Sequence, residues 1–474
     1  MSSVYRLTMV TLAAAWVCAC TPLTAVELPA PEQDPILART AASWPKVDAV
    51  GPISIGWSQF DDPALTALIS KVLAANPSLA TARAHARAVA ALADGQRSTL
   101  GPQLGVRADA GREQISANGM FPKPFGGQTF SLIEVASSLS YHLDLSGIAH
   151  AHASAARAEA QAASEDSERL ADTLSAAAAR LYYGLAAAMA DRTELQRQQD
   201  IVERTRLLDG TRAHVGLETS VVAHRSAATA ESFREQLIQN EETVSRTRQM
   251  LAALVGEGPD AMLDFTPTSL RANPPIALPK DIRVGLLGRR ADVRAARSRV
   301  EAAAFDRTAA QRAYVPDVDF AALLGLQSRS GGTLFSAGSR EWSAVPALSL
   351  PVFDGGLRRS AIASQIAQYE AARADYERLV VAAVDDVSRA LTGRAAATAA
   401  LAVAQTSEAE EAAAVGSIER RVRAGISPEA ELLAAKNRLI ERNREVLRLI
   451  ERSRSLDVDL IEALGGMPRE EKQP

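Results

Sequence analysis

The sequence contains only two cysteines, Cys18 and Cys20, and both lie near its N-terminus. There is no CxxC pair, and if Cys20 becomes the first residue of the mature protein, no internal disulfide can form. Aromatic residues make up only 4% of the chain, a low share for a globular enzyme with a thick core. The formal charge is −4 and the Lys and Arg residues form no basic block, so we expect no nucleic-acid partner.

Motifs that carry chemistry are also missing. The sequence has no phosphate-cradling glycine loop and no GxSxG nucleophile elbow. Among the six histidines, His150 and His152 are two residues apart on a predicted helix and face apart, which makes them a poor metal pair. The FDGG stretch at 353–356 is better explained as a strand-to-helix corner with Asp354 as an N-cap. We therefore expect no enzyme, with no catalytic residue, no metal and no cofactor.

Long apolar runs are absent except at the N-terminus. Residues 7–17, which follow Arg6, have about the length of a signal-peptide core and are too short to span a bilayer. The run ends in VCACTP, where the small residues before Cys20 resemble a bacterial lipobox. We expect Cys20 to be acylated and to anchor the chain to outer-membrane lipid; an ordinary signal peptide with incidental cysteines is the alternative. Because no later segment reaches the ~20 apolar residues of a membrane helix, any membrane span must be made of strands.

The strongest internal signal is a duplication. The segment from Asn76 reads NPSLATARAHARAVAALADGQRSTLGPQLGV, and it aligns without a gap on RADVRAARSRVEAAAFDRTAAQRAYVPDVDF, which begins at Arg290. Each copy predicts a helix of about 25 residues that ends where a proline begins a strand. Farther along, Gly147 matches Gly355, and a glycine turn near 216 matches another near 425. The chain is therefore built from two related halves.

Four segments alternate apolar and polar residues with the period of a β-strand. They pair as two predicted hairpins, residues 101–145 and 314–353, with Gly- and Ser-rich loops. The apolar members are Leu104, Val106, Ala108, Ala110, Ile133, Val135, Leu139, Tyr141, Leu143, Leu145, Val318, Phe320, Leu324, Leu326, Trp342, Ala344, Leu348, Leu350 and Val352. Such strands fit a half-buried soluble sheet or an outer-membrane barrel wall with lipid outside and water within. Four strands are too few to close an aqueous barrel alone, so several chains must contribute.

The rest of each half predicts helix. From Ile148 to His214 only Gly184 and Gly210 interrupt the pattern. A continuous helix there would be roughly 100 Å long at ~1.5 Å per residue. Apolar stripes near 3.5-residue spacing indicate coiled-coil contacts between helices. Their members are Leu170, Leu174, Ala177, Leu181 and Leu185 in the first half, and Ile362, Ile366, Tyr369, Tyr376, Leu379 and Val387 in the second.

These signals divide the chain into six predicted parts. They are a signal peptide (1–19), a lipid-anchored extended tether (20–58), a first structural repeat (59–265), a Pro-rich linker (266–281), a second structural repeat (282–466) and a flexible tail (467–474). Each repeat holds a helix, a β-hairpin and long helices that reverse direction at one of the glycine turns.

Taken together, these motifs resemble the TolC-like outer-membrane factors of tripartite efflux systems, in particular their lipoprotein (OprM/NodT-type) branch. The resemblance is carried by WSQFDDPALTALISKVLAANPSLATARAHAR, LLGRRADVRAARSRVEAA and LSLPVFDGGLRRS, and by the duplication and the glycine turns. It covers about residues 57–466. One departure is that the Gly-Pro-Asp-Tyr often found after the lipidated cysteine of this branch is missing.

The resemblance implies a mixed α/β membrane protein that assembles as a homotrimer. Four strands from each of three chains would form one 12-stranded outer-membrane β-barrel, continued by a long coiled-coil periplasmic tunnel. The channel would passively conduct drugs or other small molecules to the exterior, driven by an inner-membrane pump reached through a periplasmic adaptor. The alternatives are an exit duct of the same architecture for a peptide, protein or signalling oligosaccharide, and a monomeric structural lipoprotein.

The two glycine turns are the expected sites of partner contact. Glycine supplies the positive φ that a tight turn needs, and Pro428 suits the first turn of the returning helix. The resemblance implies that both tips contact the adaptor; turns without a partner are the alternative. The tip residues are Val215, Gly216, Leu217, Ala424, Gly425 and Ile426.

The second tip also carries a candidate pore constriction. Channels of this family have acidic residues six and nine positions after the second-tip glycine, and here these positions are Glu431 and Ala434. The resemblance implies that three Glu431 side chains face one another across the pore, where carboxylates repel one another and attract cations. An exposed helix glutamate near Arg438 is the alternative. The matching position in the first repeat is Val222, so the two tips differ in charge.

Overall fold

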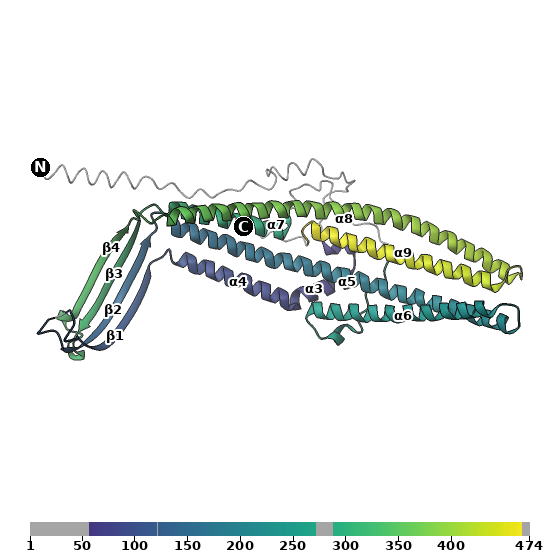
Figure 1. Ribbon diagram of the computed structural model, residues 1–474, viewed down its shortest axis with the longest axis horizontal. Coiled ribbons are helices and arrows are strands. Elements are labelled where there is room, and N and C mark those ends of the chain that lie inside the picture. Colours follow the sequence, from purple (N-terminus) through teal and green to yellow (C-terminus); the bar gives the residue numbers. More distant parts are fainter. Residues whose placement is uncertain (1–55, 121, 272–287, 467–474) are drawn as a thin grey trace. The chain divides into compact units, whose positions relative to one another are not determined.

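The computed structural model of the protein describes residues 56–120, 122–271 and 288–466 (Figure 1). The predicted signal peptide, Cys20, nearly all of the tether, most of the Pro-rich linker and the tail lie outside these residues. The described residues form two compact units. The first unit comprises residues 85–164 and 295–376, and the second comprises the remaining described residues. Each unit takes residues from both predicted repeats.

The secondary structure repeats along with the sequence. Three pairs of elements have equal lengths of 22, 12 and 67 residues. They are α4 (Pro77–Ser98) with α7 (Ala291–Arg312), β1 (Gln103–Gln114) with β3 (Asp317–Ser328), and α5 (Ile148–His214) with α8 (Leu357–Arg423). Helix α5 runs through Gly184 and Gly210 without a break. The predicted fold class, a duplicated chain with very long helices and four strands, is therefore confirmed.

The first unit contains the sheet. Its four antiparallel strands follow the order β1-β2-β3-β4, with β2 at Thr129–Leu143 and β4 at Arg340–Ser349. Both predicted pairings, β1 with β2 and β3 with β4, are present. Strand β2 also pairs with β3, so one continuous sheet joins the strands of the two halves. The loop between β3 and β4 holds two short 3-10 helices, η5 (Gly331–Thr333) and η6 (Ala337–Ser339).

Alanines make the helix contact of the first unit. Ala155 and Ala158 of α5 and Ala302 of α7 are buried together, and Phe305 packs against them. Side chains this small let helix axes approach closely, because interaxial distance depends on the residues at the contact. The abundance of alanine in the sequence thus serves thin helix interfaces.

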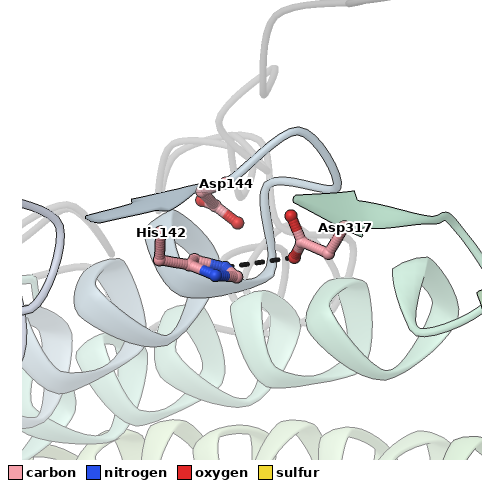
Figure 2. Close-up of side chains that lie close together, drawn as sticks. All are labelled: His142, Asp144 and Asp317. Carbon is pink, nitrogen blue, oxygen red and sulfur yellow. Dashed lines mark ion pairs between the residues drawn. The ribbon is translucent and has the colours of Figure 1, made fainter. Parts of the chain in front are cut away.

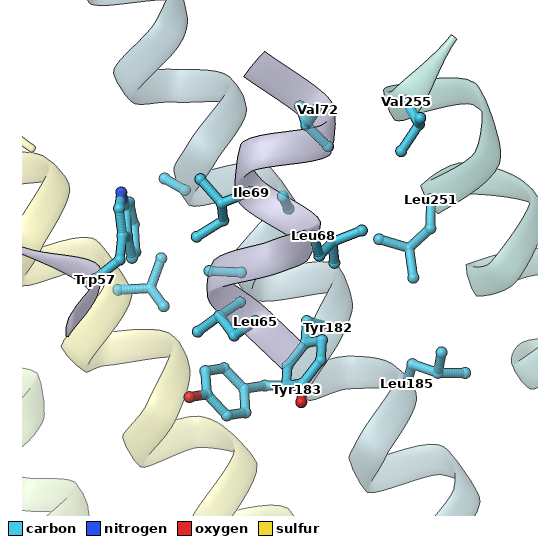
Figure 3. Packing of buried hydrophobic residues seen from close by; sticks show 14 of the residues in the cluster. Trp57, Leu65, Leu68, Ile69, Val72, Tyr182, Tyr183, Leu185, Leu251 and Val255 are labelled. Atoms are coloured by element: carbon cyan, nitrogen blue, oxygen red, sulfur yellow. The ribbon is translucent and has the colours of Figure 1, made fainter. Parts of the chain in front are cut away.

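A compact apolar core holds the second unit together (Figure 3). Helix α3 (Pro63–Ala75) lies at its centre and packs against α5, α6 (Ser220–Val255) and α9 (Glu429–Ala463). The 3-10 helices η2 (Trp57–Phe60) and η3 (Pro259–Met262) add Trp57, Phe60 and Met262. The labelled members of the core are Trp57, Leu65, Leu68, Ile69, Val72, Tyr182, Tyr183, Leu185, Leu251 and Val255.

The buried face of α5 differs in part from the predicted stripe. Leu185 is fully buried, but Leu174 and Leu181 are only half-buried and lie at the margin of the core. The fully buried positions are instead Ala176, Ala178, Ala179 and Tyr182. Because α5 packs against several helices at once, its buried face is wider than a two-helix coiled-coil seam and is centred on other residues.

The Tyr182 hydroxyl is the polar centre of this core. It donates to the Asp62 carboxylate (2.8 Å) and accepts a hydrogen bond from the Thr268 backbone N–H (2.8 Å). The same Asp62 carboxylate caps α3 by accepting from the backbone N–H groups of Ala64 and Leu65. One phenol therefore joins the start of α3, the middle of α5 and the segment after α6, three parts that are far apart in the sequence.

One backbone contact in this unit occurs in both repeats, at matching positions. Asn76 donates from Nδ2 to the backbone carbonyl of Leu254 at 2.7 Å. At the matching positions, Arg290 donates from Nη1 to the carbonyl of Ala463 at 3.4 Å. Arg290 also binds Asp292 and Asp386. Although burial alone would raise it, the hydrogen bonds and charge of Arg290 hold the pKa of Asp292 below its ordinary value.

The Tyr182→Phe substitution tests this polar centre. We expect the free energy of unfolding to fall by about 1–3 kcal/mol, because the partly buried Asp62 carboxylate loses one of its donors and the Thr268 N–H loses its acceptor. Tyr183→Phe is the matched control, since the Tyr183 hydroxyl forms no hydrogen bond with any described residue. Thermal and denaturant unfolding of the purified protein gives both values, and equal losses in the two variants would contradict the assignment.

Candidate channel wall and helix turns

The strand register gathers the predicted apolar residues on one face of the sheet. Residues paired across an antiparallel ladder share a face. Leu104 lies opposite Leu139, Tyr141 opposite Phe320, and Leu324 opposite Trp342. This apolar face is open in the single chain, because Leu104 is 74% exposed, Leu324 69% and Trp342 74%.

The opposite face of the sheet is polar. Arg107 of β1 forms ion pairs with Asp109 (2.6 Å) and with Glu134 of β2 (3.4 Å). Glu134 in turn lies opposite Gln327 of β3. Three neighbouring strands thus present charged and amide groups on this face. A wall with lipid-compatible side chains on one face and water-compatible side chains on the other follows directly from the alternation in the sequence.

The sheet also has two free edges. Among the described residues, no strand pairs with the outer edge of β1 or of β4. Every residue of both edge strands is exposed. An exposed edge of this length is a template for pairing with another strand. No helix within the described ranges is long and apolar enough to cross a membrane.

The two helix turns are built alike. Gly216 and Gly425 have φ angles of 77° and 70°. The residue after each glycine closes the end of its helix. The N–H groups of Leu217 and Ile426 donate to the carbonyls of Arg212 and Arg421, at 2.8 and 2.9 Å. This six-to-one bond with a left-handed glycine is the Schellman arrangement that ends a helix.

Both tips expose apolar side chains, and the second tip also places basic and acidic residues on different helices. Val215, Leu217 and Ile426 are exposed. In the second tip, basic residues end α8 and acidic residues begin α9, which complements the helix dipoles. Pro428 is the residue just before α9 and not, as predicted, part of its first turn. Its ψ of 151° is extended, so the helix can begin only at the next residue.

Glu431 lies in the first turn of α9 and is exposed. Within the described parts of the chain it forms no ion pair. Arg438 pairs instead with Glu411, at 3.6 Å. The neighbouring Glu429 differs, because it binds Arg204 at 3.0 Å. Glu431 is therefore the acidic group of this tip that is available to a partner, a cation or another chain.

Asp354 fulfils its predicted role at the start of α8. Its carboxylate accepts from the backbone N–H groups of Gly356 (2.9 Å) and Arg358 (3.2 Å). These two hydrogen bonds hold the pKa of Asp354 below its ordinary value. Asp144 caps α5 in the same way, through Ala149 and His150.

Sequence analysis missed a cluster of His142, Asp144 and Asp317 around this second cap. The alternation assigns His142 to the polar face of β2, but nothing in the sequence gives its partners. Only the pairing of β2 with β3 brings Asp317 close. A search for His and Asp at predicted strand ends would have been the one available signal.

Glycine substitutions test the turn geometry. An added Cβ meets no atom within 4 Å at Gly425 or at Gly210, so only backbone conformation distinguishes the two sites. Gly425→Ala should destabilise the turn by about 1–2 kcal/mol because alanine disfavours positive φ. Gly210→Ala, inside α5, should stabilise its helix by about 0.5–1 kcal/mol. Hydrogen exchange of peptides over 205–220 and 415–435 measures both, and the same sign at both sites would contradict the prediction.

Comparisons with known proteins agree with this geometry. The family model described as outer membrane efflux protein matches residues 68–257 and 284–466. Multidrug resistance outer membrane protein MdtP of Escherichia coli (strain K12) is 28% identical over 343 residues, 70% of this chain and 70% of that protein. Fusaric acid resistance protein FusA of Burkholderia cepacia is 29% identical over 329 residues, 66% of this chain and 60% of that protein.

A solved structure gives the same result. The outer membrane protein VceC from Vibrio cholerae has a TM-score of 0.77 at 29% sequence identity, over 88% of this chain and 99% of that one. The family match spans both repeats and more than half of the chain, and the resemblance to TolC-like channels is confirmed. With its duplicated long helices and two-faced sheet, the chain belongs to the outer membrane efflux protein family and is an outer-membrane efflux channel.

Proposed function

We propose that three copies of this chain form the outer-membrane channel of a tripartite efflux system. The observation that carries the proposal is the four-stranded sheet, with an exposed apolar face, a charged opposite face and two free edges. Pairing β4 of one chain with β1 of the next would satisfy both edges. Three such sheets would close one 12-stranded barrel with lipid outside and water within.

The proposed cargo is a set of small molecules that move passively through the channel. Two relatives are named for multidrug resistance and for fusaric acid resistance, which favours drugs and other small organic compounds. The energy would come from an inner-membrane pump. No chemical step is needed, so we propose that the chain is not an enzyme. An exit duct for a peptide, protein or oligosaccharide is the second candidate.

The proposed partners bind at two places. A periplasmic adaptor would contact the two tips, which is supported by their exposed apolar side chains, Val215, Leu217 and Ile426. Gly216, Ala424 and Gly425 would shape these contacts through the backbone. An acyl chain on Cys20 would attach the protein to outer-membrane lipid, as in the lipoprotein branch. A monomeric structural lipoprotein would leave the apolar sheet face in water, which is unfavourable.

Glu431 is the proposed pore constriction. In a trimer, three Glu431 side chains at the returning helices would form a ring of carboxylates. The exposure of Glu431 and the engagement of Glu429 by Arg204 support this choice. Such a ring would attract cations and slow their passage.

The assembly is tested by electrophoresis and by one pair of substitutions. The wild-type protein should migrate without heating as a stable, heat-modifiable trimer in detergent extracts, and a monomer would defeat the proposal. Leu324→Arg places a charge on the apolar face and should cost up to about 2–4 kcal/mol per chain, which reduces the amount of trimer. Ser343→Arg, on the polar face of the adjacent strand, is the control and should assemble normally. Equal assembly of both variants would contradict the assignment of the faces.

The constriction is tested by conductance. In planar bilayers, divalent cations should block wild-type channels, and Glu431→Gln should weaken this block because the ring loses its charge. Ala434→Asp adds a carboxylate one helical turn further on and should strengthen the block. Glu429→Gln removes the same charge from the same turn and is the control. Block that is unchanged in Glu431→Gln, or equally weakened in Glu429→Gln, would show that the constriction lies elsewhere.

A further inference from the structure

The cluster around His142 lies in the first unit, where β2 ends and β3 begins (Figure 2). His142 is near the end of β2, Asp144 follows β2 in the connection to α5, and Asp317 is the first residue of β3. One ligand atom from each of the three side chains lies within 4.8 Å of the other two. The side chain of Asp144 is 4% exposed, that of Asp317 18% and that of His142 34%. The cluster is thus enclosed on the carboxylate side and open at the imidazole.

Both ring nitrogens of His142 face carboxylates. Nδ1 lies 2.7 Å from Asp319 Oδ1, and Nε2 lies 3.1 Å from Asp317 Oδ2. A neutral imidazole has one N–H, so it can donate to only one of these oxygens. If Nδ1–H donates to Asp319, the unprotonated Nε2 lies 3.1 Å from an acceptor oxygen of Asp317. A second proton or a metal ion held at Nε2 would make this contact favourable.

We propose that this cluster binds a divalent metal ion of the zinc class. His142 Nε2 and carboxylate oxygens of Asp144 and Asp317 would be the ligands, with water completing a tetrahedral site. Zinc bonds of about 2.0–2.2 Å place ligand atoms roughly 3.3–3.6 Å apart, close to the present separation of Nε2 and Asp317 Oδ2. The ligand set combines imidazole, which suits zinc, with two hard oxygens.

Each of the three proposed ligands also has a hydrogen-bonding neighbour that orients it, as is usual around a bound metal ion. The contact of Nδ1 with Asp319 matches the carboxylate–histidine–zinc arrangement, which fixes the tautomer and leaves Nε2 free to bind. The Ser146 hydroxyl donates to Asp317 Oδ2 at 3.0 Å and orients that carboxylate. Asp144 is held by the backbone N–H groups of α5 and by His150.

The local charge also favours a cation. Three carboxylates, those of Asp144, Asp317 and Asp319, meet at this point. The nearby Arg312 donates to the Ser146 carbonyl at 3.4 Å and forms no ion pair with them among the described residues. Among the residues that the structure describes, only His142 and His150 form ion pairs with these oxygens as possible cations. A bound divalent ion would offset the repulsion that the carboxylates otherwise experience.

The duplication indicates that the fold itself does not require this cluster. By the two alignments, Asp317 and Asp319 correspond to Gln103 and Gly105, and His142 and Asp144 correspond to Leu350 and Val352. The matching positions therefore lack every ligand, yet α8 begins normally with Asp354 as its cap. Helix capping alone explains the presence of Asp144. It does not explain the presence of His142, Asp317 and Asp319. This inference does not depend on the proposed cargo or on the Glu431 ring.

Zinc binding by the intact, detergent-solubilised protein tests the proposal. After removal of metal with a chelator, equilibrium dialysis against zinc should give one tightly bound ion per chain, and zinc should raise the thermal unfolding temperature. His142→Gln should weaken binding by at least about 100-fold and abolish the thermal shift. Asp319→Asn keeps all three ligands and should weaken binding by about 10–100-fold. His152→Gln, which breaks the separate pair with Asp306, is the matched control and should bind like wild type.

Two outcomes would overturn the proposal. If wild type and His142→Gln retain zinc equally, the metal binds elsewhere on the chain. If wild type retains no zinc, the cluster is an imidazolium paired with carboxylates only. Unheated electrophoresis of each variant, showing the same assembly as wild type, ensures that a loss of binding is not a loss of folding. The zinc affinity of Asp319→Asn is a second, independent measurement, because this substitution leaves all three proposed ligands in place.

Discussion

The four-stranded sheet exposes an apolar face and two unpaired edges, and both require contacts that the described chain does not make with itself. Burying apolar surface and pairing backbone N–H and C=O groups are the two strongest demands on any strand. The long helices, by contrast, satisfy their backbone hydrogen bonds internally. The sheet is therefore the part of the molecule that sets its surroundings: an apolar medium on one side, water on the other and further strands at each edge.

The duplication explains how the second unit is held together. Asn76 and Arg290 occupy matching positions, and each donates to the matching carbonyl, of Leu254 or Ala463. Two different side chains thus maintain one inherited contact between the start of a short helix and the end of a long hairpin. The apolar core is less symmetric, because the Tyr182 hydroxyl of α5 has no counterpart in the matched helix α8.

Periodicity in the sequence predicts most of the elements, since the strand and helix repeats differ sharply. It also predicts the faces of the sheet, because antiparallel register must align the apolar positions. It does not predict which face of α5 is buried, since that depends on several helices packing at once. The cluster at His142 was missed for a similar reason: Asp317 is far away in the sequence, and only the pairing of β2 with β3 brings the two together.

Differences between the repeats are the places where specific chemistry can arise. If the halves were identical, a trimer would present six equivalent copies of every feature. The two halves differ where Glu431 matches Val222, and where His142 and Asp144 match Leu350 and Val352. Each difference would reduce that number to three in a trimer. Charged groups that repel one another are easier to accommodate in threes than in sixes, because each added like charge raises the energy of all the others. Sequence divergence after the duplication thus permits a charged group at one of two matching positions without its repetition at the other.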